Sequence, residues 1–208
     1  MTRDDERMQR AQQGVLVGGL ADVPGIMAAM RLTPSMGTHL RGLADELLVN
    51  DYPGATISRF DRETLATAVS AANDCFFCMD SHAEHGAALL HGEEFGAGLA
   101  LLDEVKRGDF AGFDPKMQAL LHISRTVGGN ALELTAADVE AAKAAGASDA
   151  DVQLAVAIAA GFSMYNRLVD GLRAQTPPVT EVYRETAARI AANGYSGPPG
   201  GVAPERVR

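Results

Sequence analysis

The sequence predicts an all-α, single-domain helical bundle. Apolar residues recur at helical spacing along nearly the whole chain, and almost no stretch shows the period-two alternation of β-branched residues that marks a strand. The chain has 208 residues, of which 47% are hydrophobic and 22% charged, so it is long enough for one sizeable core. We expect one all-helical domain at 20–193, a polar segment at 1–19 and a flexible Gly/Pro-rich tail at 194–208, which would become ordered only on a partner chain.

Caps and chain breakers divide the first part of the domain into three expected helices. The first is expected at 22–30, with an acidic N-cap and with Pro24 in its first turn, where the missing N–H of proline costs little. The second is expected at 33–49, where leucines recur along one face until a loop with proline and glycine ends it. The third, at 57–72, begins with a sequence like a capping box at 58–61.

Helical periods continue to the end of the domain. The most apolar stretch, 152–164, is about 13 residues long, well short of the roughly 20 that span a bilayer, so we expect a buried helix and no membrane segment. Thr135, and either Ser148 or Asp149, are expected to cap two of the later helices. These later helices are expected at 95–105, 115–127, 135–145, 148–172 and 180–192.

Both cysteines of the chain lie in one short stretch. They are Cys75 and Cys78, and His82 follows the second by four residues. Residues 73–74 are Asn and Asp, strong N-caps but poor helix-interior residues, so we expect one helix to end there and another to run from Cys75 to His91. One continuous helix is the alternative. Two thiols three residues apart lie about one helical turn apart, with His82 above them on the same face.

The chemistry of the thiols depends on where this second helix begins. If Asn73 or Asp74 is its cap, both cysteines lie in the first turn, where unpaired N–H groups and the helix dipole favour an anion and lower the pKa of a thiol. His82 is then placed to accept the proton of Cys78, since side chains at i and i+4 meet on a helix. The plainer alternative is that both cysteines are buried small hydrophobes and that His82 is structural or solvated.

Glu63 precedes Cys75 by twelve residues, and its role depends on the same break. On one straight helix it would lie roughly 18 Å from Cys75, at 1.5 Å per residue. If the chain reverses at 73–74 into an antiparallel pair, Glu63 returns to the level of His82. It then pairs with the imidazole directly or through a water, and raises its basicity. Without the reversal, Glu63 is an ordinary acid in the first turn of a helix.

This stretch resembles the signature of the alkyl hydroperoxidase D-like proteins within the carboxymuconolactone decarboxylase superfamily. The matching residues are Glu63, Cys75, Cys78 and His82, in the arrangement E-x11-C-x-x-C-x3-H. The resemblance extends into the second half of the chain, where L-T-A-A-D-V-E-A-A-K-A-A-G-A-S-D-A-D-V and the F-S-M-Y-N-R of 162–167 are similar to the peroxidase-related branch. It covers about residues 20–172.

The resemblance implies an all-α bundle of the alkyl hydroperoxidase D-like type, homo-oligomers, and thiol-dependent reduction of hydrogen peroxide or organic hydroperoxides in antioxidant defence. In that scheme Cys78 attacks the peroxide and becomes a sulfenic acid, and Cys75 condenses with it to a disulfide. An external dithiol, on a lipoylated or thioredoxin-like protein, then reduces the pair by exchange. Glu63 and His82 match the proton-relay positions, and no cofactor or metal is implied.

One residue departs from the family pattern. The family often has His or Tyr immediately before the second cysteine, whereas this chain has Phe77, which can neither donate nor accept a proton. A second relay group is therefore missing at that position. His85, two turns after Cys78 on the same face, is a candidate substitute, and a solvent-facing histidine is the alternative.

Two other classes of function compete with the peroxidase. A metal site is one, because C-x-x-C-x3-H-x2-H contains four residues that bind zinc. On one helix, however, Cys75 and His85 would stand roughly 15 Å apart, too far to share an ion, so only a three-ligand site completed by Glu63 remains. The other is a non-redox carboxymuconolactone decarboxylase-like enzyme, or an oligomeric binding protein with a vestigial thiol site. The presence of both thiols argues against the decarboxylase-like enzyme.

Charge and the N-terminal sequence narrow the partners and the compartment. The formal net charge of -9 and the absence of any run rich in Lys and Arg argue against a nucleic-acid surface. The first ten residues carry charges of both signs, and no apolar block with a small-residue cleavage site follows them. We therefore expect a cytoplasmic protein whose partners are a peroxide, a dithiol electron donor and further copies of the chain.

Overall fold

The computed structural model describes residues 5–6, 8–9, 14–18, 20, 23–178 and 180–197. This part of the chain is helical and contains no strand, only an isolated bridge between Pro24 and Gln175, so the predicted all-α class is confirmed. The α-helices are α2 (Ile26–Leu32), α3 (Pro34–Leu48), α4 (Arg59–Ala72), α5 (Phe76–Ala87), α6 (Glu93–Arg107), α7 (Pro115–Asn130), α8 (Ala136–Ala144), α9 (Asp149–Gly171) and α10 (Arg184–Asn193); η1 (Ala131–Glu133) and η2 (Thr180–Tyr183) are short 3-10 helices.

Side-chain caps begin three of the helices where the sequence predicts them. Ser58, Thr135 and Ser148 each accept a hydrogen bond from the backbone N–H three residues on, and the aspartate at that position bonds back to the cap in a capping box. Ser148, not Asp149, caps α9. These hydrogen bonds join residues only three positions apart and satisfy N–H groups that have no partner within the helix. The starts of these helices can therefore be predicted from the sequence.

The first helix differs from its prediction. α2 begins at Ile26, after Gly25 with φ 52°, so Pro24 precedes the helix instead of lying in its first turn. The predicted N-cap at residue 22 lies outside the described residues. A Cβ at Gly25 would overlap the Phe77 ring, so both the backbone conformation and the close approach to α5 require glycine here. Packing against a distant residue therefore decides where α2 starts.

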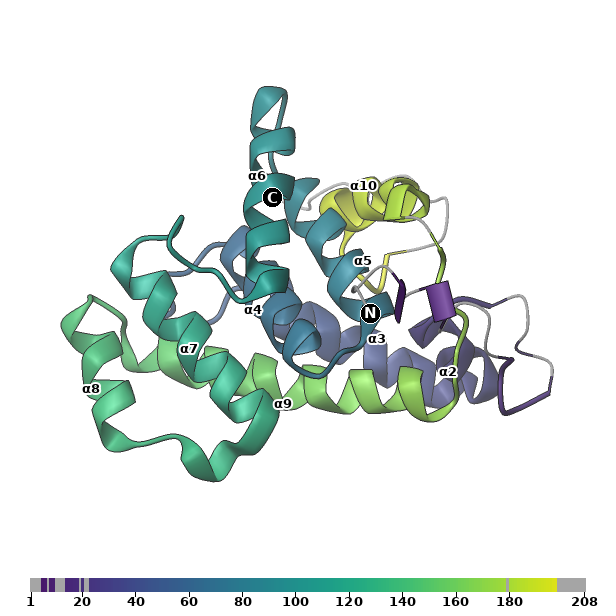
Figure 1. Ribbon diagram of the computed structural model, residues 1–208, viewed down its shortest axis with the longest axis horizontal. Coiled ribbons are helices and arrows are strands. Elements are labelled where there is room, and N and C mark those ends of the chain that lie inside the picture. Colours follow the sequence, from purple (N-terminus) through teal and green to yellow (C-terminus); the bar gives the residue numbers. More distant parts are fainter. Residues whose placement is uncertain are drawn as a thin grey trace.

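α4 lies at the centre of the molecule. It packs against α5, α6, α7 and α9, and every residue from Arg62 to Ala71 is buried. α9 crosses the lower part of the view in Figure 1, and α7 packs on it next to α4. The main apolar core includes Leu65, Val69, Leu120 and Ile158 from these helices. This core forms a rigid base beneath α5.

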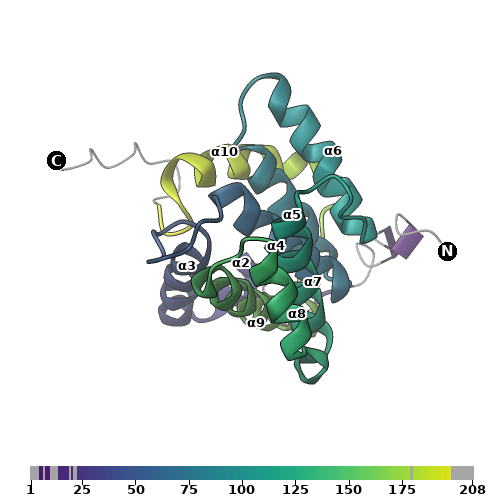
Figure 2. The ribbon, with the colours of Figure 1, turned by 90° about the vertical axis from the view of Figure 1, so that its left-hand side faces the viewer.

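α5 lies on α4 and is covered on its other sides by α6 and α10 (Figures 1 and 2). All of its residues, Phe76–Ala87, are buried. It ends at Ala87 rather than at His91 as predicted. A helix that carries two histidines, two carboxylates and a cysteine and is nevertheless buried throughout must find partners for each polar group inside the protein.

α9 is long and apolar enough to cross a membrane by length and composition, and it is the one described helix of which this is true. Its Leu154, Ile158 and Phe162 are fully buried or nearly so, and they pack inside the protein. We therefore interpret α9 as the core helix of the bundle, as the sequence predicts.

Asp151 ties the start of α9 to the loop before α4. Its carboxylate accepts hydrogen bonds from the backbone N–H of Thr56 at 2.6 Å, the Thr56 hydroxyl at 2.7 Å and the backbone N–H of Ile57 at 3.2 Å. The N–H of Ser148 adds a fourth bond at 3.0 Å. Burial alone would raise the pKa of Asp151, but the bonds from Ser148 and Thr56 outweigh it and lower the pKa.

Replacing this carboxylate tests its contribution to stability. We expect Asp151→Ala to lower the free energy of unfolding by about 2–4 kcal/mol at pH 7, because four buried or partly buried donors lose their acceptor. Since the folded pKa is lowered, this contribution is present above the unfolded value of about 3.9 and is lost as the pH falls through the folded pKa. Urea unfolding at pH 7 and near pH 3 measures both effects.

Asp149→Ala is the matched control for this experiment. The Asp149 side chain is 85% exposed and pairs with Lys143 on the surface, so its loss is expected to change the free energy of unfolding far less than the loss of Asp151. Equal losses for the two variants at pH 7 would contradict the role of Asp151.

Candidate active site

The chain reverses between α4 and α5 at the position that the sequence predicts. α4 ends at Ala72, and Asp74 adopts a left-handed conformation with φ 54°. The Asn73 side chain donates a hydrogen bond to the Asn166 side chain of α9 at 2.9 Å, which holds the turn on the core. The alternative of one continuous helix is excluded. The N-cap of α5 is Cys75 itself, not Asn73 or Asp74, so only Cys78 lies in the first turn.

The two thiols are free and buried. Cys75 is 0% exposed and Cys78 is 2% exposed. The pKa of Cys75 lies well above its usual value, first because of a hydrogen bond with the Cys78 sulfur and then because of burial and the negative charge of Cys78. The sequence-based expectation that the helix start lowers the pKa of both thiols is therefore wrong for Cys75. The raised pKa means that Cys75 holds its proton more tightly than an ordinary thiol.

Glu63 and His82 form the direct pair that the chain reversal predicts. Their side chains meet across the α4–α5 contact, with His82 Nδ1 2.6 Å from Glu63 Oε2, and both residues are buried. The helices approach closely because Gly86 has no side chain: a Cβ there would lie 3.3 Å from Glu63 Cβ. The edge of the His82 ring also packs on Phe162 of α9, with ring centroids 4.5 Å apart. The imidazole is thus held on two sides.

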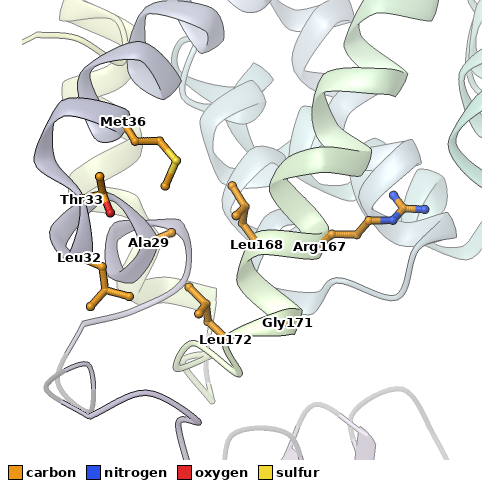
Figure 3. A pocket seen from close by; sticks show the side chains of 8 residues that line it. All are labelled: Ala29, Leu32, Thr33, Met36, Arg167, Leu168, Gly171 and Leu172. Carbon is orange, nitrogen blue, oxygen red and sulfur yellow. The ribbon is translucent and has the colours of Figure 1, made fainter.

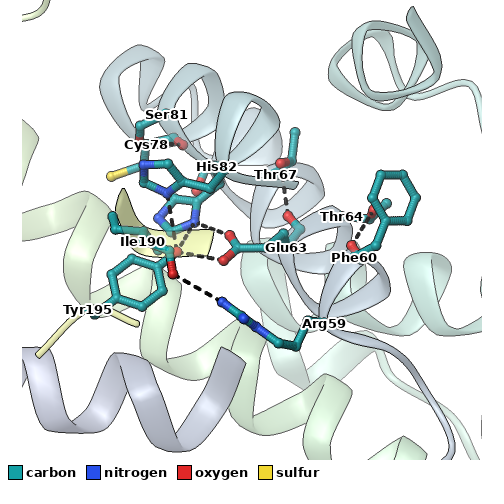
Figure 4. Close-up of polar contacts among 12 residues, drawn as sticks. Arg59, Phe60, Glu63, Thr64, Thr67, Cys78, Ser81, His82, Ile190 and Tyr195 are labelled. Atoms are coloured by element: carbon teal, nitrogen blue, oxygen red, sulfur yellow. Dashed lines mark hydrogen bonds and ion pairs between the residues drawn. The ribbon is translucent and has the colours of Figure 1, made fainter. Parts of the chain in front are cut away.

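A third polar group, Tyr195, joins this pair. Its hydroxyl donates to Glu63 Oε1 at 2.6 Å and lies 3.2 Å from His82 Nδ1 (Figure 4). Sequence reasoning missed it, because Tyr195 falls in the 194–208 segment that we expected to be flexible. The described part of that segment, residues 194–197, lies against the domain instead. The signal available in the sequence was that Tyr195 is the single aromatic residue of a segment rich in glycine and proline.

His85 is part of the same group. It is 5% exposed, and its Nδ1 lies 3.2 Å from the Tyr195 hydroxyl, so the alternative of a solvent-facing histidine is wrong. Burial, followed by the charges of His82 and Arg189, holds the pKa of His85 well below its usual range. His85 is therefore a neutral imidazole at physiological pH. It contacts Tyr195 and is not itself a base exposed to solvent.

Solved structures show where this fold occurs. One is the alkylhydroperoxidase AhpD core of an uncharacterized peroxidase-related protein from Ralstonia eutropha, with a TM-score of 0.65 and 23% identity over 88% of this chain and 90% of that one. Another is an uncharacterized peroxidase-related protein from Silicibacter sp., with a TM-score of 0.63 and 22% identity over 74% of this chain and 76% of that one. This chain has the alkylhydroperoxidase-core fold. No family model and no curated protein matches the sequence.

The same site could also hold a metal ion, because it brings together three possible ligands among the described residues: Glu63, His82 and His85. Their ligand atoms lie within 4.8 Å of one another, and all three residues are buried. Both cysteines are outside this group, so the four-ligand site of Cys75, Cys78 and the two histidines does not form. The Tyr195 hydroxyl already contacts Glu63 and both imidazoles, and an ion would have to displace it or use it as a ligand. Hydrogen bonds occupy both Glu63 oxygens and the Nδ1 atoms of both histidines, whereas His85 Nε2 is buried without a hydrogen-bond partner.

A cavity of about 290 Å³ lies elsewhere in the molecule, between α2, the start of α3 and the end of α9 (Figure 3). Its lining is apolar apart from Thr33 and Arg167, and it includes neither cysteine, neither histidine of α5 nor Glu63. The chemistry of the thiols and the imidazole is therefore placed in a packed part of the fold and not in this cavity.

The Glu63 carboxylate is expected to control how readily Cys78 loses its proton. In a Cys75→Ser background, we expect Glu63→Gln to slow alkylation of Cys78 by iodoacetamide about tenfold at pH 7. The glutamine amide carries no charge to stabilise the His82 imidazolium, and a tenfold change corresponds to about one pKa unit.

Glu84→Gln is the matched control, since Glu84 is also a buried carboxyl but lies on α5 and faces Arg184, with an N–O distance of 3.6 Å. Its alkylation rate should stay near that of the parent protein. An unchanged rate in Glu63→Gln would contradict the pairing of Glu63 with a functional His82.

Proposed function

We propose that the protein is a thiol-dependent peroxidase that reduces hydrogen peroxide or organic hydroperoxides through a Cys75/Cys78 dithiol–disulfide cycle, in antioxidant defence. The observation that carries the proposal is the buried Glu63–His82 pair beside the helix start that holds both free cysteines. Cys78 and His82 lie on neighbouring turns of one face of α5, and His82 in turn meets the Glu63 carboxylate of α4 (Figure 4). The peroxidase-related names of two structures with this fold agree with the proposal.

In the first step, His82 takes the proton of the Cys78 thiol, and the thiolate attacks one oxygen of the peroxide. The O–O bond breaks, an S–O bond forms, and Cys78 becomes a sulfenic acid. The leaving oxygen accepts the proton from His82 and departs as water or an alcohol. Glu63 stabilises the imidazolium that exists between the two proton transfers.

In the second step, Cys75 attacks the sulfenic acid of Cys78. An S–S bond forms, and the sulfenic oxygen leaves as water with the proton of Cys75. The raised pKa of Cys75 supports this division of roles, because a thiol that stays protonated beside Cys78 leaves that sulfur as the first nucleophile.

The resulting disulfide must be reduced by an external dithiol before another turnover. Our proposal includes a lipoylated or thioredoxin-like donor, a homo-oligomeric assembly and a cytoplasmic location, all carried over from the family resemblance. A cytoplasmic donor is consistent with a cysteine pair that has to be returned to the dithiol state, since that compartment maintains reduced thiols.

Phe77 has a packing role in this scheme. Its ring makes an edge contact with Tyr183, with centroids 5.5 Å apart, and it lies against Gly25. It therefore fixes the start of α5 between α2 and η2, while the proton relay rests on His82 and Glu63.

The thiols are expected to disappear together when the protein meets a peroxide. One equivalent of hydrogen peroxide should remove two free thiols per chain from the reduced protein, as measured by thiol titration. Cys78→Ser should consume no peroxide, because the attacking sulfur is gone. Cys75→Ser should consume one equivalent and hold a sulfenic acid at Cys78 that dimedone traps. Peroxide consumption by Cys78→Ser at the parental rate would contradict the proposal.

The burial of the thiols favours a small peroxide. Cys75 and Cys78 belong to an apolar cluster that also contains Leu20, which is 1% exposed. We expect hydrogen peroxide to oxidise the reduced protein at least about tenfold faster than cumene hydroperoxide. Leu20→Ala should narrow that ratio by opening space in the cluster.

Leu132→Ala provides the control for this comparison, since Leu132 is 94% exposed and lies in η1. Its ratio of rates should match that of the parent protein. Equal rates for the two peroxides in the parent would contradict the preference for a small peroxide. The thiol titration tests the dithiol–disulfide cycle separately.

A further inference from the structure

Tyr195 connects groups that come from separate parts of the chain. Its hydroxyl lies 2.6 Å from a Glu63 oxygen on α4 and 3.2 Å from a nitrogen of each histidine on α5. A phenol has one proton to donate, and the shortest contact directs it to the carboxylate. The phenol oxygen is then left as the acceptor for His85 Nδ1–H, so this contact selects the tautomer of His85.

The backbone around Tyr195 is held in place by Asp45 of α3. The Asp45 carboxylate accepts the Tyr195 N–H at 2.6 Å and the Ser196 N–H at 2.9 Å. Gly194, with φ 72°, makes the bend after α10, and a Cβ there would press on the Asp45 carboxylate. The segment is thus fixed by two charge-assisted bonds and a glycine turn.

Arg59 fixes the other side of this connection. Its guanidinium donates to the backbone oxygen of Ala191 at 2.9 Å and to that of Ile190 at 3.2 Å, both near the end of α10 (Figure 4). Arg59 precedes Glu63 by one helical turn on α4. The same face of α4 therefore holds the end of α10 and receives the tyrosine that follows it.

The phenol is a permanent donor in this position. Burial, followed by the charge of Glu63, raises the pKa of Tyr195 well above its usual value. The hydroxyl therefore keeps its proton at neutral pH, so the bond to Glu63 is not lost there by ionisation of the phenol.

We propose that Tyr195 is a positioning residue of the thiol site: its hydroxyl holds and partly neutralises the Glu63 carboxylate, and through it sets how strongly His82 holds a proton. The role of Tyr195 in catalysis rests on the proposed function. Its effect on the proton affinity of His82 does not, because that effect involves only the contact with the Glu63–His82 pair. Tyr195 supplies from the C-terminal segment a polar group that position 77 lacks.

The sign of the effect follows from the charge on Glu63. A hydrogen bond to a carboxylate stabilises its charged form, so removal of the phenol leaves the Glu63–His82 pair more ready to take up a proton. The pair should then gain its proton at a higher pH, and less of the free base should be present at neutral pH. The free energy of one hydrogen bond to a charged group corresponds to a change of about one unit in the pKa of the pair.

Other charged groups around the pair are the same in the protein and in its variant at Tyr195. Lys106 of α6 is engaged by Asp80 and Asp103, and Asp170 of α9 acts on Cys75. The charges of Arg59 on α4 and Asp45 on α3 act on Tyr195, and those of His82 on α5 and Arg189 on α10 act on His85.

The test is the pKa of His82, measured by NMR titration of the histidine ring signals in the full-length reduced protein, with His82→Gln used to assign the signal. We expect Tyr195→Phe to raise the pKa of His82 by about one unit, the size of one bond to a charged group. If the protein consumes peroxide, the acid limb of its pH–rate profile should move up by the same amount. The NMR readout needs no turnover, so failure of the peroxidase proposal and failure of this one are distinguishable.

A second variant changes the contact between Tyr195 and Glu63 indirectly, through the backbone of the tyrosine. Asp45→Asn leaves the phenol intact but weakens the anchor of the segment, so we expect a smaller upward shift. The double variant with Tyr195→Phe should shift no further than Tyr195→Phe alone, because Asp45 acts through the phenol.

Tyr165→Phe is the control for the loss of a buried hydroxyl. Tyr165 is 4% exposed and donates to the backbone oxygen of Leu40 at 2.7 Å, without contact to Glu63. It should lose stability and leave the pKa of His82 unchanged. An unchanged pKa of His82 in folded Tyr195→Phe, or an equal shift in Tyr165→Phe, would overturn the proposal. Should Tyr195→Phe not fold, an unchanged pKa in Asp45→Asn overturns it alone.

Discussion

An ionised carboxylate inside a protein is unfavourable unless hydrogen bonds or charges compensate for its lost hydration, and Glu63 is only 1% exposed. Its two oxygens are met by His82 and by Tyr195, each at 2.6 Å. These partners come from α5 and from the segment after α10, so one buried charge joins the middle of the chain to its C-terminal part. The rest of the site is arranged around this requirement.

The packing of α4 and α9 makes that arrangement rigid. The Asn166 side chain of α9 accepts a hydrogen bond from the Asn73 side chain at the α4–α5 turn. It also donates one to the Ser70 hydroxyl of α4 at 3.0 Å. The turn is therefore fixed from both helices, and the N-cap of α5 follows directly. A site whose groups lie on buried helices keeps its distances better than one on loops. This suits a mechanism in which protons move between fixed groups.

α5 also buries polar groups on the side away from this site. Asp80 pairs with Lys106 of α6 at 3.1 Å, and Glu84 faces Arg184 of α10. Burial raises the pKa of Glu84, an effect that the charges of Arg184 and Lys106 only partly offset. The reactive side chains of α5 thus belong to a helix that is anchored by charge on several sides, and its position relative to α4 is well determined.

The sequence by itself determined the features that depend on residues within a few positions of one another. Helical periods indicated the all-α class, Ser58 and Thr135 indicated helix starts, and the poor helix propensity of 73–74 indicated the reversal that brings Glu63 to His82. Tertiary structure alone decided the role of Tyr195, which is 132 residues from Glu63, and the direction of the Cys75 pKa. The physical reason is range: caps and helical periods act over one or two turns, whereas a buried hydroxyl or thiol takes its partners and its acidity from whatever the fold packs against it.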